Sequence, residues 1–249
     1  MLIRRSIRLA LTLSAACLAS ACAIAAIAAP LDGEYVYTPA GHASGTLSIS
    51  GGKFTISTVG SNCHSCDVQG KLDGNHGIAG DADQTCRITF SDDHGTLKLD
   101  SGNSDACRSF CGARAMFDGQ YQKAPQACSD HSRSSRLKQA RGQYGAKNFT
   151  AAATSYQSLL DQCSTFMDWI EADRVRSELA LTQYHMGDNA QCLSTLAPTR
   201  AIENQSNGGD DSDGTFGLPP CDAENYQSTG KAILHNAALC KGTAQQVAK

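Results

Sequence analysis

GTLSISGGKFTIS, residues 45–57, alternates polar and apolar side chains on both sides of a glycine pair. A period of two predicts β-strands with one buried face, and the glycine pair supplies the turn of a β-hairpin. Similar alternation recurs at 86–90 and 95–99, and Asp73-Gly74 marks another turn. Short strands separated by regular turns predict a small antiparallel β-barrel or sandwich spanning residues 29–125.

The two ends of this β region share a pattern. Asp32-Gly33-Glu34-Tyr35 opens the region, and Asp118-Gly119-Gln120-Tyr121 closes it. A first and a last strand with one pattern could pair side by side and remove the exposed sheet edges. Coincidence in a glycine-rich sequence is the alternative, so barrel and sandwich both stay open.

The N-terminus has the pattern of an export signal. Three arginines precede an apolar run rich in alanine and leucine, and Ala26-Ile27-Ala28 is an A-x-A cleavage site. We therefore expect residues 1–28 to be a signal peptide and the mature chain to be periplasmic or secreted. Two variants stay open: Arg4-Arg5 as part of a twin-arginine signal, and lipid attachment at Cys22.

Removal of residues 1–28 changes the formal net charge from −3 to −6, because this segment carries three arginines and no acid. A mildly acidic mature chain argues against nucleic acid or anionic lipid as the main partner. No later stretch is apolar enough to span a bilayer. Ten of the twelve cysteines remain, and an even number in an exported chain predicts structural disulfides. They are Cys63, Cys66, Cys86, Cys107, Cys111, Cys128, Cys163, Cys192, Cys221 and Cys240.

SNCHSCDVQG, residues 61–70, holds a C-x-x-C pair formed by Cys63 and Cys66. A redox pair normally begins a helix, whereas this region has the pattern of a strand. A zinc site needs four ligands, and Cys107 and Cys111 could complete the set. An exported chain favours disulfides over both alternatives. We expect Cys63 and Cys66 to bond to two different cysteines.

The pairing that we favour within the β region joins Cys66 to Cys86. Cys66 and Val68 would share one strand face, and so would Cys86 and Ile88, so a bridge could cross between the two strands. Six cysteines allow fifteen connectivities, and the other pairings stay open.

After Cys128 the apolar spacing changes to three and four, which predicts an α-helical domain over residues 126–249. Helices are expected at about 149–163, 174–188, 189–198 and 222–240. The polar insertion at 204–218 predicts a flexible acidic surface loop. The apolar stripe of the first of these helices consists of Phe149, Ala152, Ala153, Tyr156, Leu159, Leu160 and Cys163.

GQYGAKNFTAAATSYQSLL, residues 142–160, resembles a tetratricopeptide hairpin, with a tyrosine that ends one helix, a short turn and an aromatic residue that opens the next. LALTQYHMGDNAQCLSTLAP, residues 179–198, is similar. The two turn tyrosines, Tyr144 and Tyr184, are 40 residues apart, against about 34 in the family. The resemblance covers residues 136–198. It implies a helical stacking scaffold that binds a peptide or protein, with the last helix and disulfides capping two repeats.

The sequence contains no nucleophile elbow, H-E-x-x-H motif, phosphate loop or dinucleotide fingerprint. We therefore expect a non-enzymatic exported protein-binding protein that uses no cofactor or metal and engages a protein or peptide of the cell envelope. Analogy with the repeat family places the partner on the inner face of the first helices, near Arg141, Tyr144 and Gln183. Trp169, the single tryptophan, is interpreted as a core residue rather than a ligand contact.

Two alternatives remain. Small exported β-barrels held by disulfides are similar in architecture to periplasmic lysozyme inhibitors, which would make this chain an inhibitor or immunity protein against a cell-wall hydrolase. The other alternative is a thiol–disulfide exchange enzyme that uses Cys63 and Cys66.

Overall fold

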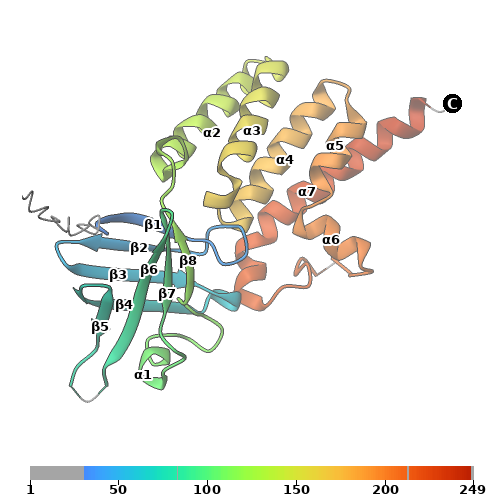
Figure 1. The fold of residues 1–249 in the computed structure, drawn as a ribbon. Helices are drawn as coiled ribbons and strands as arrows, with labels where there is room; N and C mark the ends of the chain where they lie inside the picture. Colours follow the sequence, from blue (N-terminus) through green and yellow to red (C-terminus); the bar gives the residue numbers. More distant parts are fainter. Residues whose placement is uncertain (1–30, 83, 212, 248–249) are drawn as a thin grey trace, which may run out of the picture. The chain divides into compact units, whose positions relative to one another are not determined.

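The computed structural model describes residues 31–82, 84–211 and 213–247. The expected signal peptide, with its cleavage site and Cys22, lies outside these residues. Within them the chain forms an eight-stranded closed antiparallel β-barrel followed by α-helices (Figure 1), which confirms the predicted fold class. The strands are β1 (Gly33–Tyr37), β2 (Gly45–Ser50), β3 (Lys53–Val59), β4 (Ser65–Asp73), β5 (His76–Ala79), β6 (Cys86–Asp93), β7 (Thr96–Asp100) and β8 (Gly119–Gln122).

The barrel closes through the two segments that share a pattern. β1 pairs antiparallel with β8, with Val36 opposite Gln122 and Tyr37 opposite Tyr121. The rings of Tyr37 and Tyr121 lie 4.8 Å apart inside the barrel. The repeated tyrosine pattern therefore marks the closing seam, and the β region is a barrel rather than a sandwich.

The glycine pair between β2 and β3 makes the predicted hairpin turn. Gly51 and Gly52 have φ of 57° and 73°, and Ser50 lies opposite Lys53. Two successive positive φ angles are typical of a type I′ turn, whose twist matches that of the strands it joins. The turn thereby fixes which residues of β2 and β3 face the core, and Leu47 and Ile56 are both fully buried.

The barrel interior is filled at one level by the rings of Phe54 and Phe90, which pack edge to face at 5.3 Å. Gly70 and Gly77 provide the room for them. A Cβ atom at Gly77 would lie 2.6 Å from the ring of Phe90 and 2.8 Å from that of Phe54. Both rings are buried, and the close packing of protein cores leaves little room for such rings to shift.

Replacement of Gly77 by alanine is expected to lower the free energy of unfolding by about 1–3 kcal/mol, because the added methyl group overpacks this core. Gly142→Ala is the matched control. Gly142 lies inside a helix with no atom within 4 Å of the added carbon, so this substitution should raise the same free energy by about 0.5–1 kcal/mol. Denaturant unfolding measures both. Equal effects of the two substitutions would contradict this packing.

A short helix, α1 (Asp105–Arg108), lies between β7 and β8. The chain then continues as α2 (Asp130–Gly145), α3 (Phe149–Cys163), α4 (Trp169–His185), α5 (Asn189–Leu196), α6 (Arg200–Ser206) and α7 (Pro220–Val247), with 3-10 turns at Ser61–Cys63, Gln126–Cys128 and Ser164–Phe166. Side-chain caps begin four of these helices: Ser129, Asn148, Asp168 and Asp188 accept backbone N–H groups of α2, α3, α4 and α5. No helix among the described residues is long and apolar enough to cross a membrane.

Two helical hairpins, α2–α3 and α4–α5, share one turn geometry. The turns span residues 143–148 and 183–188, and each contains one residue with positive φ, Lys147 (58°) or Gly187 (81°). In both turns this residue donates its backbone N–H to the carbonyl three residues earlier. The residue after it donates its N–H to the carbonyl five residues earlier. The same connection between two helices therefore occurs twice, displaced by 40 residues.

The side chains inside the two hairpins repeat as well. Gln143 accepts a hydrogen bond from the hydroxyl of Ser155 at 2.8 Å, and Gln183 accepts one from the hydroxyl of Thr195 at the same distance. These pairs are again 40 residues apart. The spacing that relates Tyr144 to Tyr184 in the sequence thus also relates a turn, a helix cap and a side-chain contact.

Five disulfides join the ten cysteines in pairs. Cys63 and Cys66 bond to different partners, Cys221 and Cys111, as expected. The remaining pairs are Cys86–Cys107, Cys128–Cys163 and Cys192–Cys240. Five disulfides indicate folding in an oxidising compartment outside the cytosol.

The favoured Cys66–Cys86 pairing is wrong. Both side chains are buried, as their strand positions predicted, but β5 is short and pairs with β4 only from Gly70 onward. The segment after α1 covers the other half of this edge of β4, where Asp67 donates its N–H to the carbonyl of Phe110 at 3.2 Å. Covering this edge brings Cys111 opposite Cys66, and α1 brings Cys107 to Cys86.

The polar insertion is anchored at its C-terminal end. The segment predicted as a flexible loop at 204–218 begins inside α6, and Phe216 near its end is fully buried. The Phe216 ring packs against Gly230 of α7, where a Cβ atom would lie 2.4 Å from the ring. Arg200 holds the backbone here by donating to the carbonyls of Phe216 and Gly217 at 3.2 and 3.1 Å.

Candidate functional site

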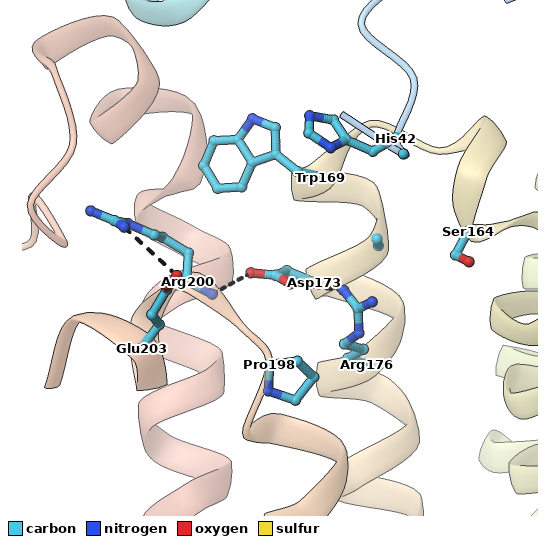
Figure 2. A pocket seen from close by; sticks show the side chains of 10 residues that line it. His42, Ser164, Trp169, Asp173, Arg176, Pro198, Arg200 and Glu203 are labelled. Atoms are coloured by element: carbon cyan, nitrogen blue, oxygen red, sulfur yellow. Dashed lines mark hydrogen bonds and ion pairs between the residues drawn. The ribbon is translucent and has the colours of Figure 1, made fainter. Parts of the chain in front are cut away.

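A hollow of about 330 Å³ lies beside α4 and α6 (Figure 2), and we call it the α4–α6 pocket. Its volume is near the lower end of the range for small-ligand sites. Its lining comes from the loop after β1, the turn after α3, the first two turns of α4, and the start of α6. The lining residues are Gly41, His42, Ser164, Trp169, Ala172, Asp173, Arg176, Pro198, Arg200 and Glu203.

Local helix geometry brings the α4 members together. Trp169, Asp173 and Arg176 follow at spacings of four and three, which place them on one face of the helix. Asp168 begins the helix by accepting the N–H of Glu171 at 2.9 Å, so Trp169 lies in the first turn. In Figure 2 the carboxylate of Asp173 lies beside the guanidinium of Arg176.

Asp173 is the buried centre of the pocket, with 3% of its surface exposed. Its Oδ2 accepts the hydroxyl of Tyr226 at 2.7 Å and the backbone N–H of Arg200 at 2.9 Å, and its Oδ1 accepts Arg176 at 3.1 Å. Burial raises the pKa of this carboxyl, whereas the three hydrogen-bond donors lower it. The effect of burial is the larger, so the pKa lies above its ordinary value. Burial raises the pKa of Tyr226, and the neighbouring Asp173 raises it further.

The two arginines differ in how fully they are engaged. Arg200 donates to two backbone carbonyls and lies 3.7 Å from the carboxylate of Glu203. Arg176 donates one hydrogen bond, from Nη1 to Asp173, and its Nε and Nη2 have no acceptor within the described part of the chain. Its side chain is 26% exposed. Arg176 therefore presents hydrogen-bond donors to whatever enters the pocket.

Trp169 forms an aromatic wall of the pocket. The centroids of its ring and the Tyr226 ring lie 5.0 Å apart, and the residue is partly buried. His42, from the loop between β1 and β2, lines the same hollow. The interpretation of Trp169 as a core residue is thus incomplete, because its ring both packs against the helical core and lines the pocket.

The titration of Asp173 predicts a pH dependence of stability. A carboxyl whose pKa is higher in the folded chain adds stability below its ordinary pKa, and this contribution is lost as the pH rises through the raised pKa. We therefore compare the free energy of unfolding of the wild type with that of Asp173→Asn at each pH. The wild-type value minus the variant value should fall from about pH 4 upward and level off above the raised pKa. Urea unfolding across pH 3–8 measures this difference. A difference that grows with pH would contradict a pKa that burial raises.

The partner-binding residues expected from the sequence fall into two groups. Arg141 is half-exposed on α2, where its Nε donates to Glu178 of α4 at 2.9 Å. Tyr144 lies at the tip of the first hairpin, where its ring centroid is 5.5 Å from that of Phe149 and 5.7 Å from that of His185. Arg141 and Tyr144 both remain accessible to a partner. Gln183 is 6% exposed and is hydrogen-bonded inside the second hairpin, so it is removed from the candidate set.

Sequence reasoning missed the α4–α6 pocket. A signal was present in α4, where Asp173 interrupts a buried face and Arg176 follows one turn later. Such a charged pair on a buried helix face requires further partners, and here Tyr226 and Arg200 supply them. Nothing in the sequence spacing connects those two residues to α4.

The C-x-x-C pair does not form its own disulfide. A redox motif of this kind cycles between a dithiol and a bond between its two cysteines. Cys63 and Cys66 bond instead to Cys221 and Cys111. Cys63 and Cys66 thus each belong to a separate disulfide, and each disulfide joins this part of the barrel to a different segment of the chain.

No protein-family model matches this chain, and neither the curated proteins nor the solved structures give a match.

Proposed function

We propose that the mature chain is a non-enzymatic exported protein-binding protein whose helical hairpins hold a protein or peptide partner. The observation that carries this proposal is the repetition of one hairpin at a spacing of 40 residues. Repeated helical hairpins stack into extended surfaces that are used for binding, in the manner of tetratricopeptide proteins. The mature chain is periplasmic or secreted, after removal of residues 1–28.

Side chains near the tips of the two hairpins supply the chemistry of the contact. Tyr144 and Phe149 of the first hairpin and His185 of the second form an aromatic cluster, in which the ring centroids of His185 and Phe149 lie 5.0 Å apart. Arg141 lies one helical turn before Tyr144 and is 49% exposed. Aromatic residues and arginine are the side chains that most often dominate protein interfaces.

The buried acid of the α4–α6 pocket supports a non-enzymatic role. Asp173 is buried and accepts three hydrogen bonds. A general base needs a free carboxylate within reach of the proton that it removes. Asp173 therefore acts in holding the fold together.

One observation favours the second candidate, an inhibitor or immunity protein against a cell-wall hydrolase. Val59 and Met116 are 54% and 64% exposed, and they are neighbours because the Thr58 hydroxyl donates to the carbonyl of Met116 at 2.8 Å. The Cys66–Cys111 disulfide attaches the segment that carries Met116 to strand β4 of the barrel. An exposed apolar pair on a rigid rim is suited to docking on another protein.

Affinity capture tests the proposal. Mature protein immobilised through its C-terminus is incubated with an envelope extract from the producing cells, beside Arg141→Glu and a Val59→Ser/Met116→Ser variant. We expect a partner that the wild type and the barrel variant retain and that Arg141→Glu loses. Loss in the barrel variant, together with inhibition of a cell-wall hydrolase by the wild type, would replace the proposal with the inhibitor function. Capture of no partner by the wild type would contradict both.

A further inference from the structure

We propose that the α4–α6 pocket is a binding site for one unit of a neutral saccharide. This site is separate from the protein-binding surface at Arg141 and Tyr144. Three features carry the inference: the balance of charge in the pocket, the mixture of hydrogen-bond donors and acceptors, and the tryptophan wall.

The charges of the pocket cancel. Asp173 and Glu203 contribute two carboxylates, and Arg176 and Arg200 contribute two guanidinium groups. Each acid lies within 4 Å of one arginine, at 3.1 Å for Asp173 and 3.7 Å for Glu203. A charged ligand would leave one of these pairs uncompensated in a partly desolvated site. The pocket is therefore matched to a ligand without net charge.

The polar groups offer both directions of hydrogen bonding. Arg176 presents Nε and Nη2 as donors, and Glu203, whose side chain is 60% exposed, presents carboxylate oxygens as acceptors. Ser164 adds a hydroxyl that can do either. A saccharide carries several adjacent hydroxyls, each a donor and an acceptor, and a planar guanidinium or carboxylate can contact two of them at once.

The indole ring of Trp169 is suited to contact the apolar face of a sugar ring. Trp169 packs against Tyr226, and the residue is only partly buried and lines the pocket. The C–H groups of a pyranose form an apolar patch, which gains dispersion contacts against an indole ring. A hollow of about 330 Å³ has room for one such ring, with the rest of a chain left outside.

The chain offers a direct reporter for this site, because Trp169 is its single tryptophan. The mature protein is titrated with the methyl glycosides of glucose, galactose and mannose, with N-acetylglucosamine and its β-linked disaccharide, and with glucuronate as the charged analogue. Tryptophan fluorescence is recorded to 50 mM ligand. We expect a saturable change with at least one neutral saccharide, and at least tenfold weaker binding of glucuronate.

Variants show whether the pocket residues make the contact. Arg176→Gln and Glu203→Ala should each weaken binding of that saccharide at least fivefold. Arg174→Gln, an exposed arginine on the same helix outside the pocket, should leave binding unchanged. Thermal unfolding confirms that each variant is folded, and a variant that is not folded is replaced by Arg176→Lys or Glu203→Ser.

Three results would overturn the proposal. The first is the absence of any fluorescence change with every neutral saccharide of the panel. The second is glucuronate binding as tightly as the neutral sugars. The third is wild-type affinity in both folded pocket variants. Each outcome leaves the proposed protein-binding function untouched, because that function is measured by capture through a different surface.

Discussion

Loss of the Cys63–Cys221 disulfide is expected to lower the free energy of unfolding by about 2–4 kcal/mol and to split unfolding into two transitions. The bond joins the loop before β4 to the start of α7, across 158 residues of sequence. Asn62 reinforces it: its backbone N–H donates to Asp222 at 2.8 Å, and its side-chain oxygen accepts the N–H of Cys221 at 3.1 Å. Without the bond, barrel and helices should unfold less cooperatively.

Calorimetry of a Cys63→Ser/Cys221→Ser variant measures this effect. Cys192→Ser/Cys240→Ser is the matched control, because it removes a disulfide whose two cysteines both lie in the helical part. The control keeps the Cys63–Cys221 link, so it should lower the midpoint while unfolding stays a single transition. A single transition with an unaltered midpoint in the Cys63→Ser/Cys221→Ser variant would show that the link does not couple the two parts.

Replacement of Asp173 by alanine is expected to cost about 2–4 kcal/mol of unfolding free energy. The substitution leaves the buried hydroxyl of Tyr226 and the N–H of Arg200 without their acceptor, and each unsatisfied buried donor costs about 1–3 kcal/mol. Asp173→Asn should cost less, because the amide retains one oxygen acceptor. The loss is larger than that of a typical surface substitution because three elements, α4, α6 and α7, meet at this carboxylate.

Chemical denaturation of the two Asp173 variants tests the ranking. Asp161→Ala serves as the control, because Asp161 is exposed on α3 and its contact is with Gln157 of the same helix. Its expected effect is within about 0.5 kcal/mol. If Asp173→Ala were as mild as Asp161→Ala, the carboxylate would not be the centre of a buried network.

The sequence predicted those parts of the fold that are governed by local rules. The glycine pair at 51–52 fixed a hairpin, and alternation over 86–90 placed Cys86, Ile88 and Phe90 on the buried face. The pattern around Tyr35 and Tyr121 marked the seam of the barrel. In each case, the period of a strand or the conformational preference of a turn decides the outcome within a few residues.

Features that depend on distant segments were not predictable in this way. The partner of Cys66 depends on how the segment after α1 covers the free edge of β4, which no periodicity describes. The α4–α6 pocket combines residues from position 41 to position 203. Gln183 has the sequence context of a groove residue, yet Thr195 of the next helix holds it in the interior. Long-range packing decides all three.

The most direct test of protein binding by the helical hairpins is site-specific photo-crosslinking in the producing cells. A photoreactive amino acid is placed at Arg141, at Met116 on the barrel rim, or at Ile78 as an exposed control on β5. We predict that the partner crosslinks from position 141, and not from positions 116 or 78. Crosslinks from position 116 alone would contradict this account and assign the partner to the barrel.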